Sequence, residues 1–290
     1  MYIQRLNHTQ KTKYSLSIRH DNRPQNNNLW HYHEELEFIY IKKGRGTFFV
    51  GDHIQHFTDG YIVLIGANTP HYWFFDDEFT GASPTEIAEI IVLHFRADFI
   101  GTDFLQSQEA TPIRKIFQIA QKALSFSPKN NDLTAFFNTI IHQAPLKQLI
   151  ELLNILNAIH YTIPYNTLVS KEYSNPQQEH DHLRMNKIIE YIRLHYKSQI
   201  LLQDISHLAD MTSNSFCRYF KQKTGKTLVQ FVNEIRINEA CKLLKNTEKL
   251  IKNIAFDCGF QNFVSFHKKF KEITGKTPIE FRKTSSLSSE

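Results

Sequence analysis

Four residues with metal-ligating side chains stand in the first quarter of this chain of 290 residues. His31 and His33 are separated by one residue, Glu37 follows four residues later, and His71 lies further along. Alternate residues of a β-strand point to the same face, so two histidines at this spacing can share one ion. Three imidazoles and one carboxylate suit iron, manganese, zinc, nickel or copper. The sequence therefore offers a possible metal site at these four positions.

The same residues fit two other roles. Histidines on a strand that faces a barrel interior can line a metal-free pocket for a small effector, or can be hydrogen-bonded structural residues. Aromatic neighbours suit stacking against a sugar or another cyclic ligand, and Phe48, Tyr72 and His94 could add to them. The candidate pocket residues are Trp30, His31, His33, Glu37, Tyr40, His71 and Trp73. We expect an effector pocket without a resident cofactor, and the metal site is the alternative.

A second constellation is a repeat near the C-terminus. The runs FCRYFKQKTGKTLVQF (216–231) and FHKKFKEITGKTPIEF (266–281) are identical at eight of sixteen positions. Each run is typical of a helix with a phenylalanine core face, ended by a glycine C-cap. Because each GKT follows a helix and no glycine-rich loop precedes it, a nucleotide-binding phosphate loop is excluded.

Each of these helices follows a shorter helix and a tight turn, at Asp210–Met211 in the first copy and Gly259–Phe260 in the second. Asp and Gly tolerate the positive φ that such a turn needs. The outward face carries residues able to reach base edges or phosphates. The candidates are Ser213, Asn214, Cys217, Arg218, Lys221, Asn262, Phe263, His267, Lys268 and Lys271. Packing against a neighbouring helix is the alternative for Phe263.

Charge supports the same interpretation. From His182 to Glu290 there are 19 Lys+Arg against 10 Asp+Glu, a balance of +9, whereas Met1 to Asp181 has 15 against 19, a balance of −4. A basic excess confined to one domain favours phosphate backbones as its partner. A long helix, expected from Leu228 to Thr247, would hold two reading helices ~34 Å apart, one turn of double-stranded DNA.

The front of the chain predicts a different architecture. Residues 15–100 contain short alternating runs typical of a β-sandwich or barrel, with a hairpin expected around the GRG of residues 44–46. Helical periodicity follows at 111–124, 131–143 and 145–161. The third helix carries a leucine-rich stripe, which is either core or the seam of a homodimer. The stripe comprises Leu146, Leu149, Ile150, Leu153, Leu156 and Asn157.

These patterns divide the chain into four parts. We expect a sensing domain at 1–105, a helical relay and dimerisation segment at 106–170, a polar linker at 171–182, and a helical DNA-binding domain at 183–284. The fold class is α+β with two domains. No apolar run is long enough to span a membrane. No signal-like stretch opens the chain, and the three cysteines suggest no disulfide framework, so we expect a cytoplasmic protein.

The run IRINEACKLLKNTEKLIKNIAFDCGFQNFVSFHKKFKEITGKTPIEFRK resembles the AraC/XylS family of bacterial transcription regulators over residues 183–283. Matching positions include Arg236, Leu243, Leu244, Gly259, Phe260, Phe270, Gly275, Pro278 and Phe281. The resemblance implies two helix-turn-helix units joined by a long helix, with Arg218 and Lys268 among the DNA-facing residues. Val264 stands where the family has Ser, which puts a cap or a phosphate contact of the second copy in doubt.

His31-x-His33-x3-Glu37-x6-Gly44 resembles the first cupin motif, and a partial second motif ends at His71. The two resemblances imply a cupin-type β-barrel that senses a small molecule and controls a DNA-binding domain. They make promoter DNA, an effector and RNA polymerase the expected partners of a homodimer. The alternative from another class is a cupin metalloenzyme, such as a dioxygenase or isomerase, with an attached nucleic-acid-binding module.

Overall fold

The computed structural model describes residues 15–22, 24, 30–80, 84–171, 173 and 181–286. The chain divides into two compact units, Met1–Asn175 and Pro176–Glu290. The division falls within the predicted linker, 171–182, most of which lies outside the described residues. Each unit is therefore described by itself.

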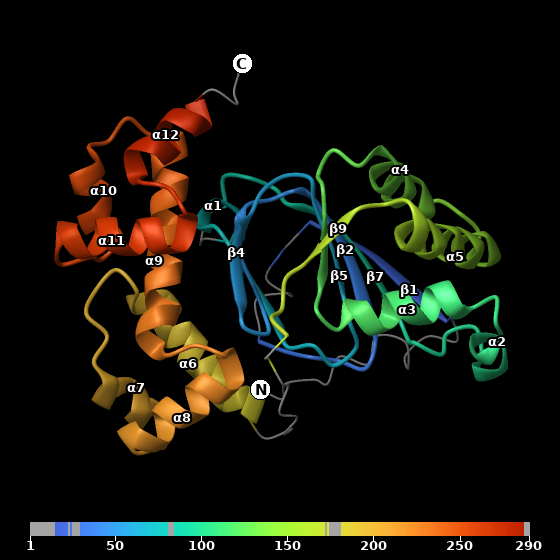
Figure 1. Cartoon of the computed structure of the whole chain (residues 1–290), viewed down its shortest axis with the longest axis horizontal. Helices are drawn as coiled ribbons and strands as arrows, with labels where there is room; N and C mark the ends of the chain where they lie inside the picture. The colour runs from blue at the N-terminus through green and yellow to red at the C-terminus, as the bar shows by residue number, and fades with distance from the viewer. Residues whose placement is uncertain are drawn as a thin grey trace. The chain divides into compact units, whose positions relative to one another are not determined.

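The first unit contains two antiparallel sheets. The larger has the order β1 (Leu16–Asp21), β7 (Glu89–Phe95), β2 (Leu36–Lys43), β5 (Tyr61–Ile65), β8 (Leu124–Phe126) and β9 (Tyr165–Thr167). The smaller has the order β4 (His53–Phe57), β3 (Gly46–Val50) and β6 (His71–Phe75). Figure 1 shows the two sheets as separate layers of this unit.

Alternation along the strands creates two cores, because successive side chains of a strand point to opposite faces. One core fills the space between the sheets and contains Ile39, Val63, Trp73 and Val92. The other covers the outer face of the larger sheet, where helices α3 (Thr111–Ala120), α4 (Asn131–Ile140) and α5 (Pro145–Tyr161) pack (Figure 1). Short helices α1 (Asp77–Thr80) and α2 (Thr102–Gln106) complete the unit.

The prediction of a hairpin around residues 44–46 is wrong. β2 pairs with β5 and β7 in the larger sheet, whereas β3 pairs with β4 and β6 in the smaller one. The GRG segment therefore carries the chain from one sheet to the other. At Gly46 a Cβ atom would lie 2.0 Å from the carbonyl oxygen of Phe74, so only glycine allows β6 to approach this closely.

The segment 106–170 is less uniformly helical than expected. It holds α3, α4 and α5, but it also contributes β8 and β9, which extend the larger sheet beyond β5. Leu124, the last residue of the helix predicted at 111–124, belongs to β8 because α3 ends at Ala120. These helices belong to the same compact unit as the strands, whose apolar outer face they bury.

The second unit is entirely helical in its described part. The helices are α6 (Asp181–His195), α7 (Leu202–Leu208), α8 (Ser213–Thr224), α9 (Leu228–Asn246), α10 (Ile251–Asp257), α11 (Phe263–Thr274) and α12 (Pro278–Ser286). The pairs α7–α8 and α10–α11 are the two repeats, and α9 joins them (Figure 1). This confirms the predicted α+β architecture. Among the described residues, no helix combines the length and apolarity of a membrane span.

The predicted turns and caps are confirmed. Asp210 has φ 54° and Gly259 has φ 90°, as a tight turn between the paired helices requires. Gly225 and Gly275 are left-handed C-caps, and their N–H groups donate to the carbonyls of Lys221 and Lys271. Local sequence thus fixes both ends of α8 and α11.

Candidate functional site

The histidines and Glu37 gather at one end of the space between the two sheets. Glu37 is on β2 and His71 opens β6, in the opposite sheet. His31 and His33 precede β2, and His31 forms an isolated bridge with His71. His94 of β7 is the cross-strand partner of Glu37. All five side chains are buried, with exposed fractions of 9% or less.

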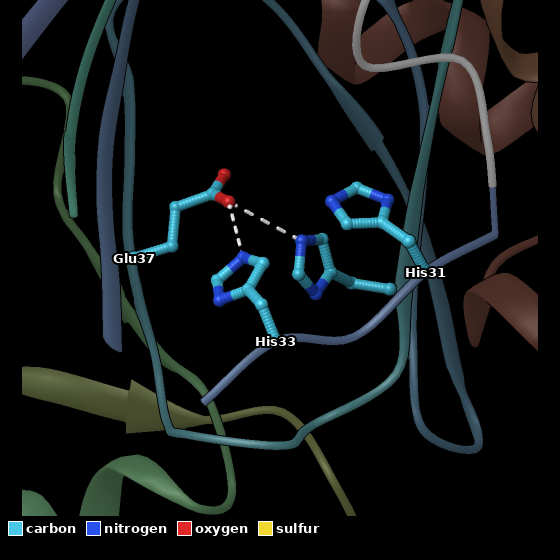
Figure 2. A group of neighbouring side chains, drawn as sticks. His31, His33 and Glu37 are labelled. Atoms are coloured by element: carbon cyan, nitrogen blue, oxygen red, sulfur yellow. Dashed lines mark hydrogen bonds and ion pairs between the residues drawn. The ribbon is translucent and has the colours of Figure 1, made fainter. Parts of the chain in front are cut away.

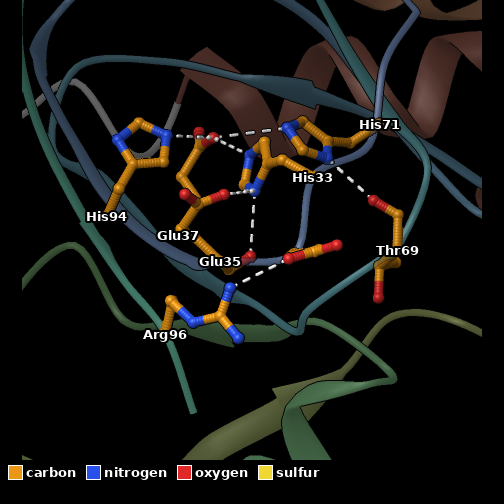
Figure 3. Close-up of polar contacts among 8 residues, drawn as sticks. His33, Glu35, Glu37, Thr69, His71, His94 and Arg96 are labelled. Carbon is orange, nitrogen blue, oxygen red and sulfur yellow. Dashed lines mark hydrogen bonds and ion pairs between the residues drawn. The ribbon is translucent and has the colours of Figure 1, made fainter. Parts of the chain in front are cut away.

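Three imidazoles converge on one carboxylate oxygen. The Nε2 atoms of His33, His71 and His94 lie 3.1, 3.3 and 3.1 Å from Oε2 of Glu37. Figure 3 shows His94 on one side of this carboxylate, with His33 and His71 on the other. The ring of His31 lies 4.2 Å from that of His71, centroid to centroid. Figure 2 shows Glu37 and His31 at opposite sides of the group.

Backbone carbonyls orient two of the imidazoles. Nδ1 of His33 donates to the carbonyl of Glu35 at 2.9 Å, and Nδ1 of His71 donates to the carbonyl of Thr69 at 2.9 Å (Figure 3). A carbonyl only accepts, so Nδ1 of each ring carries a proton and Nε2 is the ring atom presented to Glu37. Metal-binding histidines commonly have this arrangement.

Glu37 is an ionised carboxylate in this setting. Burial raises its pKa, but the charge interaction with His71 and the contacts with His33, His71 and His94 outweigh burial and lower the pKa well below its usual value. One ligand atom from each of His31, His33, Glu37 and His71 lies within 4.8 Å of the others. The donor set therefore fits a transition-metal ion.

The structure brings most of the predicted pocket residues together, and separates one. Trp30 is buried, and Trp73 lies two residues beyond His71 on the same face of β6, stacked on Phe48 at 3.9 Å. Tyr40 is on the opposite face of β2 from Glu37, against Phe137 of α4. Its assignment to the pocket is wrong, because three residues along a strand reverse the direction of a side chain.

The exposed face of α8 carries four of its five predicted DNA-binding residues. Asn214, Cys217, Arg218 and Lys221 are all exposed and follow the spacing of one helical face. Ser213 is half-buried, and its hydroxyl lies 3.2 Å from that of Ser206 in α7. Ser213 therefore joins the two helices of the first repeat rather than facing outward.

The corresponding face of α11 differs from the prediction. Lys268 and Lys271 are exposed and His267 is half-buried. Phe263, however, stacks on Phe266 beside the core, which agrees with the packing role given as its alternative. The side-chain oxygen of Asn262 accepts from the N–H groups of Val264 and Ser265, so Asn262 caps the helix. The cap placed in doubt by Val264 is therefore present.

Val264 is the residue that the sequence analysis missed on this face. Its side chain is 75% exposed, and it precedes Lys268 and Lys271 by one and two turns of α11. The offset of 50 residues between the repeats places Val264 at the position of Asn214. That offset is the signal that could have identified it.

Family models match both units. A model described as a helix-turn-helix domain matches residues 205–284, and one described as a cupin domain matches residues 23–80. The HTH-type transcriptional regulator YdeC of Bacillus subtilis is 25% identical over 267 residues, which cover 88% of this chain and 86% of YdeC. An HTH-type transcriptional regulator of Staphylococcus aureus is 27% identical over 152 residues, which cover 52% of this chain and 20% of that protein.

Among solved structures, a transcriptional regulator of Chromobacterium violaceum described as AraC-type is 23% identical, with a TM-score of 0.34. The alignment covers 37% of this chain and 96% of the other. The matched helix-turn-helix and cupin domains agree with the similarity to the regulator YdeC. The chain is a DNA-binding transcription regulator with a cupin domain ahead of an AraC-type helix-turn-helix domain.

Proposed function

We propose that this transcription regulator responds to a divalent transition-metal ion bound in its cupin barrel. The observation that carries the proposal is the convergence of three histidine Nε2 atoms on one buried oxygen of Glu37. The ion would be held by Glu37 and by histidines of the cluster. When bound, it would supply a positive charge that ties β2 to β6, which lie in different sheets.

The orientation of the donor atoms supports a cation. Nδ1 of His33 and of His71 donates to a backbone carbonyl, so each ring turns its Nε2 toward Oε2 of Glu37. A divalent cation at this point would accept a lone pair from each Nε2 atom and neutralise the charge of the carboxylate.

We also propose that the chain regulates transcription without catalysing a reaction, in the cytoplasm. It acts by binding promoter DNA, and RNA polymerase is its further partner. The exposed residues of α8 would enter one major groove and those of α11 the next. Arg218 suits a guanine and Lys221 and Lys271 suit phosphates, whereas the apolar Val264 suits a thymine methyl group.

A contact between the barrel and the start of the linker offers a route for the signal. The N–H of Gly51 donates to the carbonyl of Pro70, next to His71, at 2.9 Å. The adjacent Asp52 accepts a hydrogen bond from the N–H of Ser170 at 3.1 Å. Side chains of Val169 and Tyr173 lie 3.0 and 3.1 Å from the position of a Cβ on Gly51. A shift of His71 on metal binding would reach the linker through this turn.

A homodimer through α5 completes the proposal. Of the predicted leucine stripe, Leu156 lies in the core, together with Leu152, Ile155 and Ile159, which the prediction did not include. Leu146 and Ile150 are 70% and 45% exposed. Together with Leu153 and Asn157 they are spaced by four, three and four residues, as in a two-stranded seam. Sedimentation should give a dimer for the wild type and a monomer for Leu146→Asp/Ile150→Asp.

The test of metal-dependent regulation uses DNA fragments that the protein selects from random sequence. Binding is measured by fluorescence anisotropy with Co²⁺, with Zn²⁺ and after chelator treatment. We expect the DNA dissociation constant to change at least tenfold with metal, and Glu37→Gln to abolish that change while preserving metal-free binding. Tight metal binding with identical DNA affinity in both states would disprove the regulatory role. Absence of metal binding would disprove the metal site and return attention to an organic effector.

A further inference from the structure

A pocket of the second unit lies where three segments of the chain meet. It is formed by the segment that follows α6, by the first half of α9 and by the turn between α10 and α11. Its volume is about 270 Å³, just below the range of pockets that bind drug-sized ligands. The histidine cluster belongs to the other unit, so this pocket is a separate feature of the protein.

Arg236 is the only charged residue in the lining of this pocket. Its two hydrogen bonds go to backbone carbonyls and its guanidinium lies against the ring of Phe260, so these contacts are all with neutral groups. Within the described residues, no carboxylate forms an ion pair with it. Partial burial lowers the pKa of the guanidinium, which still remains charged. A half-buried cation in these surroundings favours the binding of an anion.

The rest of the lining suits an anion that carries an apolar body. Amide side chains, which can donate to an oxygen, come from Gln199, Asn233 and Gln261. No hydrogen bond joins these three amides to other groups of the described chain. The apolar part of the lining is formed by Ile200, Val229 and Val232.

The walls of the pocket belong to both halves of the second unit. A Cβ atom on Gly259 would lie 2.7 Å from the carbonyl oxygen of Tyr196, so the turn of the second repeat packs directly on the segment that leads into the first. Arg236 bonds the same segment from α9. A molecule in the pocket would therefore contact all three segments at once, and could favour one spacing of α8 and α11 over another.

We infer that this pocket binds a small organic anion, with a carboxylate or phosphate group on a short apolar body, and that the bound anion changes the DNA affinity of the second unit. The inference does not depend on the metal proposed for the barrel. A phosphate group could also come from the DNA backbone, and the experiment separates these two sources.

The full-length chain is titrated calorimetrically with isobutyrate and with isobutyramide, its neutral amide. We expect isobutyrate to bind at least tenfold more tightly. Asn233→Asp places a carboxylate three residues before Arg236 on the same face of α9, where it takes the place of the anion. Isobutyrate affinity should fall at least fivefold in this variant and stay within twofold in Asn253→Asp, the same exchange at an exposed position outside the lining.

DNA binding is then measured with and without isobutyrate on the selected fragments. We expect the DNA dissociation constant of the wild type to change at least threefold, and that of Asn233→Asp to stay constant. Val229→Phe, which fills the pocket from an exposed position, should suppress the response in the same way. No isobutyrate binding, equal losses in the two aspartate variants, or binding without an effect on DNA would overturn the inference. If Asn233→Asp alone weakens DNA binding and lowers the salt slope by about 1, the pocket holds a backbone phosphate, and the free anion is disproved.

Discussion

The carboxylate of Asp52 accepts a hydrogen bond from the backbone N–H of Ser170, 118 residues later in the chain, at 3.1 Å. Asp52 belongs to the turn between β3 and β4, and Ser170 follows β9 directly before the linker. The turn is bonded on its other side to Pro70, the neighbour of His71. The turn thus connects the segment that leaves the first unit with a neighbour of the histidine cluster.

Replacement of Asp52 by alanine should uncouple the two functions of the chain. A hydrogen bond from a backbone N–H to a carboxylate contributes about 1–2 kcal/mol, so the free energy of unfolding should fall by that amount. Co²⁺ affinity should stay within twofold of the wild type, since Asp52 is not a ligand. The change in DNA affinity on adding Co²⁺ should shrink at least threefold. Exposed Asp98→Ala is the matched control, and equal metal responses in both variants would contradict the proposed route.

Arg236 should stabilise the second unit, because it connects α9 to the segment that follows α6 and to the second repeat. Its Nε and Nη2 atoms donate to the carbonyls of Tyr196 and Ser198, at 2.7 and 2.8 Å, and its guanidinium lies 5.7 Å from the ring of Phe260. We expect Arg236→Ala to lower the free energy of unfolding by roughly 2 kcal/mol in urea titrations. Arg236→Lys should recover only part of the loss, because lysine cannot bond both carbonyls with one planar group. An Arg236→Ala variant with the same free energy of unfolding as the wild type would show that these contacts do not stabilise the unit.

Replacing the lysines proposed to contact DNA and replacing Arg218 should weaken DNA binding in different ways. Lys221→Ala and Lys271→Ala should weaken binding to all sequences and reduce the slope of log affinity against log salt by about 1 each. Arg218→Ala should cost about 1–3 kcal/mol on the selected site and relax the preference for one base pair. Salt titrations and competition with single-base variants separate the two effects, with Lys115→Ala in the first unit as control. Unaltered specific binding in Arg218→Ala would mean that α8 does not read the site.

The three cysteines should differ sharply in reactivity. Cys217 is exposed on α8, whereas burial raises the pKa of Cys241 and of Cys258 to about 12. At pH 8 these two thiols would be ionised at only about one part in 10⁴, and the thiolate is the reactive form. A thiol reagent should therefore modify one cysteine in the native chain and three in denaturant. Alkylation of the wild type should also weaken DNA binding, and the Cys217→Ser variant should not show this effect. Rapid modification of all three thiols in the native chain would contradict the protection expected for Cys241 and Cys258.

The helix-turn-helix unit shows how much local sequence determines. Phenylalanines four residues apart, a glycine C-cap and a turn residue that tolerates positive φ all act within a few residues. The sequence therefore predicted both repeats, the long helix between them and the exposed basic face. For Ser213, Asn262 and Phe263 the sequence allowed capping or packing as well as DNA contact. In the structure Ser213 lies beside Ser206, Asn262 caps α11 and Phe263 packs beside the core. Sequence alone leaves these roles open, because a polar group at a helix N-terminus can bond a neighbour or the backbone as readily as DNA.

The barrel shows what only the tertiary structure decided. Periodicity identified the strands, and the resemblance to the cupin motif identified His31, His33 and Glu37. Strand pairing, however, depends on contacts between distant residues, which alternation alone does not specify. The crossover at Gly46 was therefore mistaken for a hairpin, and Tyr40 was assigned to the wrong face. The sequence placed His94 only among possible lining residues. Its position against Glu37 follows from the register of two strands far apart in the chain, because pairing, rather than sequence proximity, determines which side chains share a site.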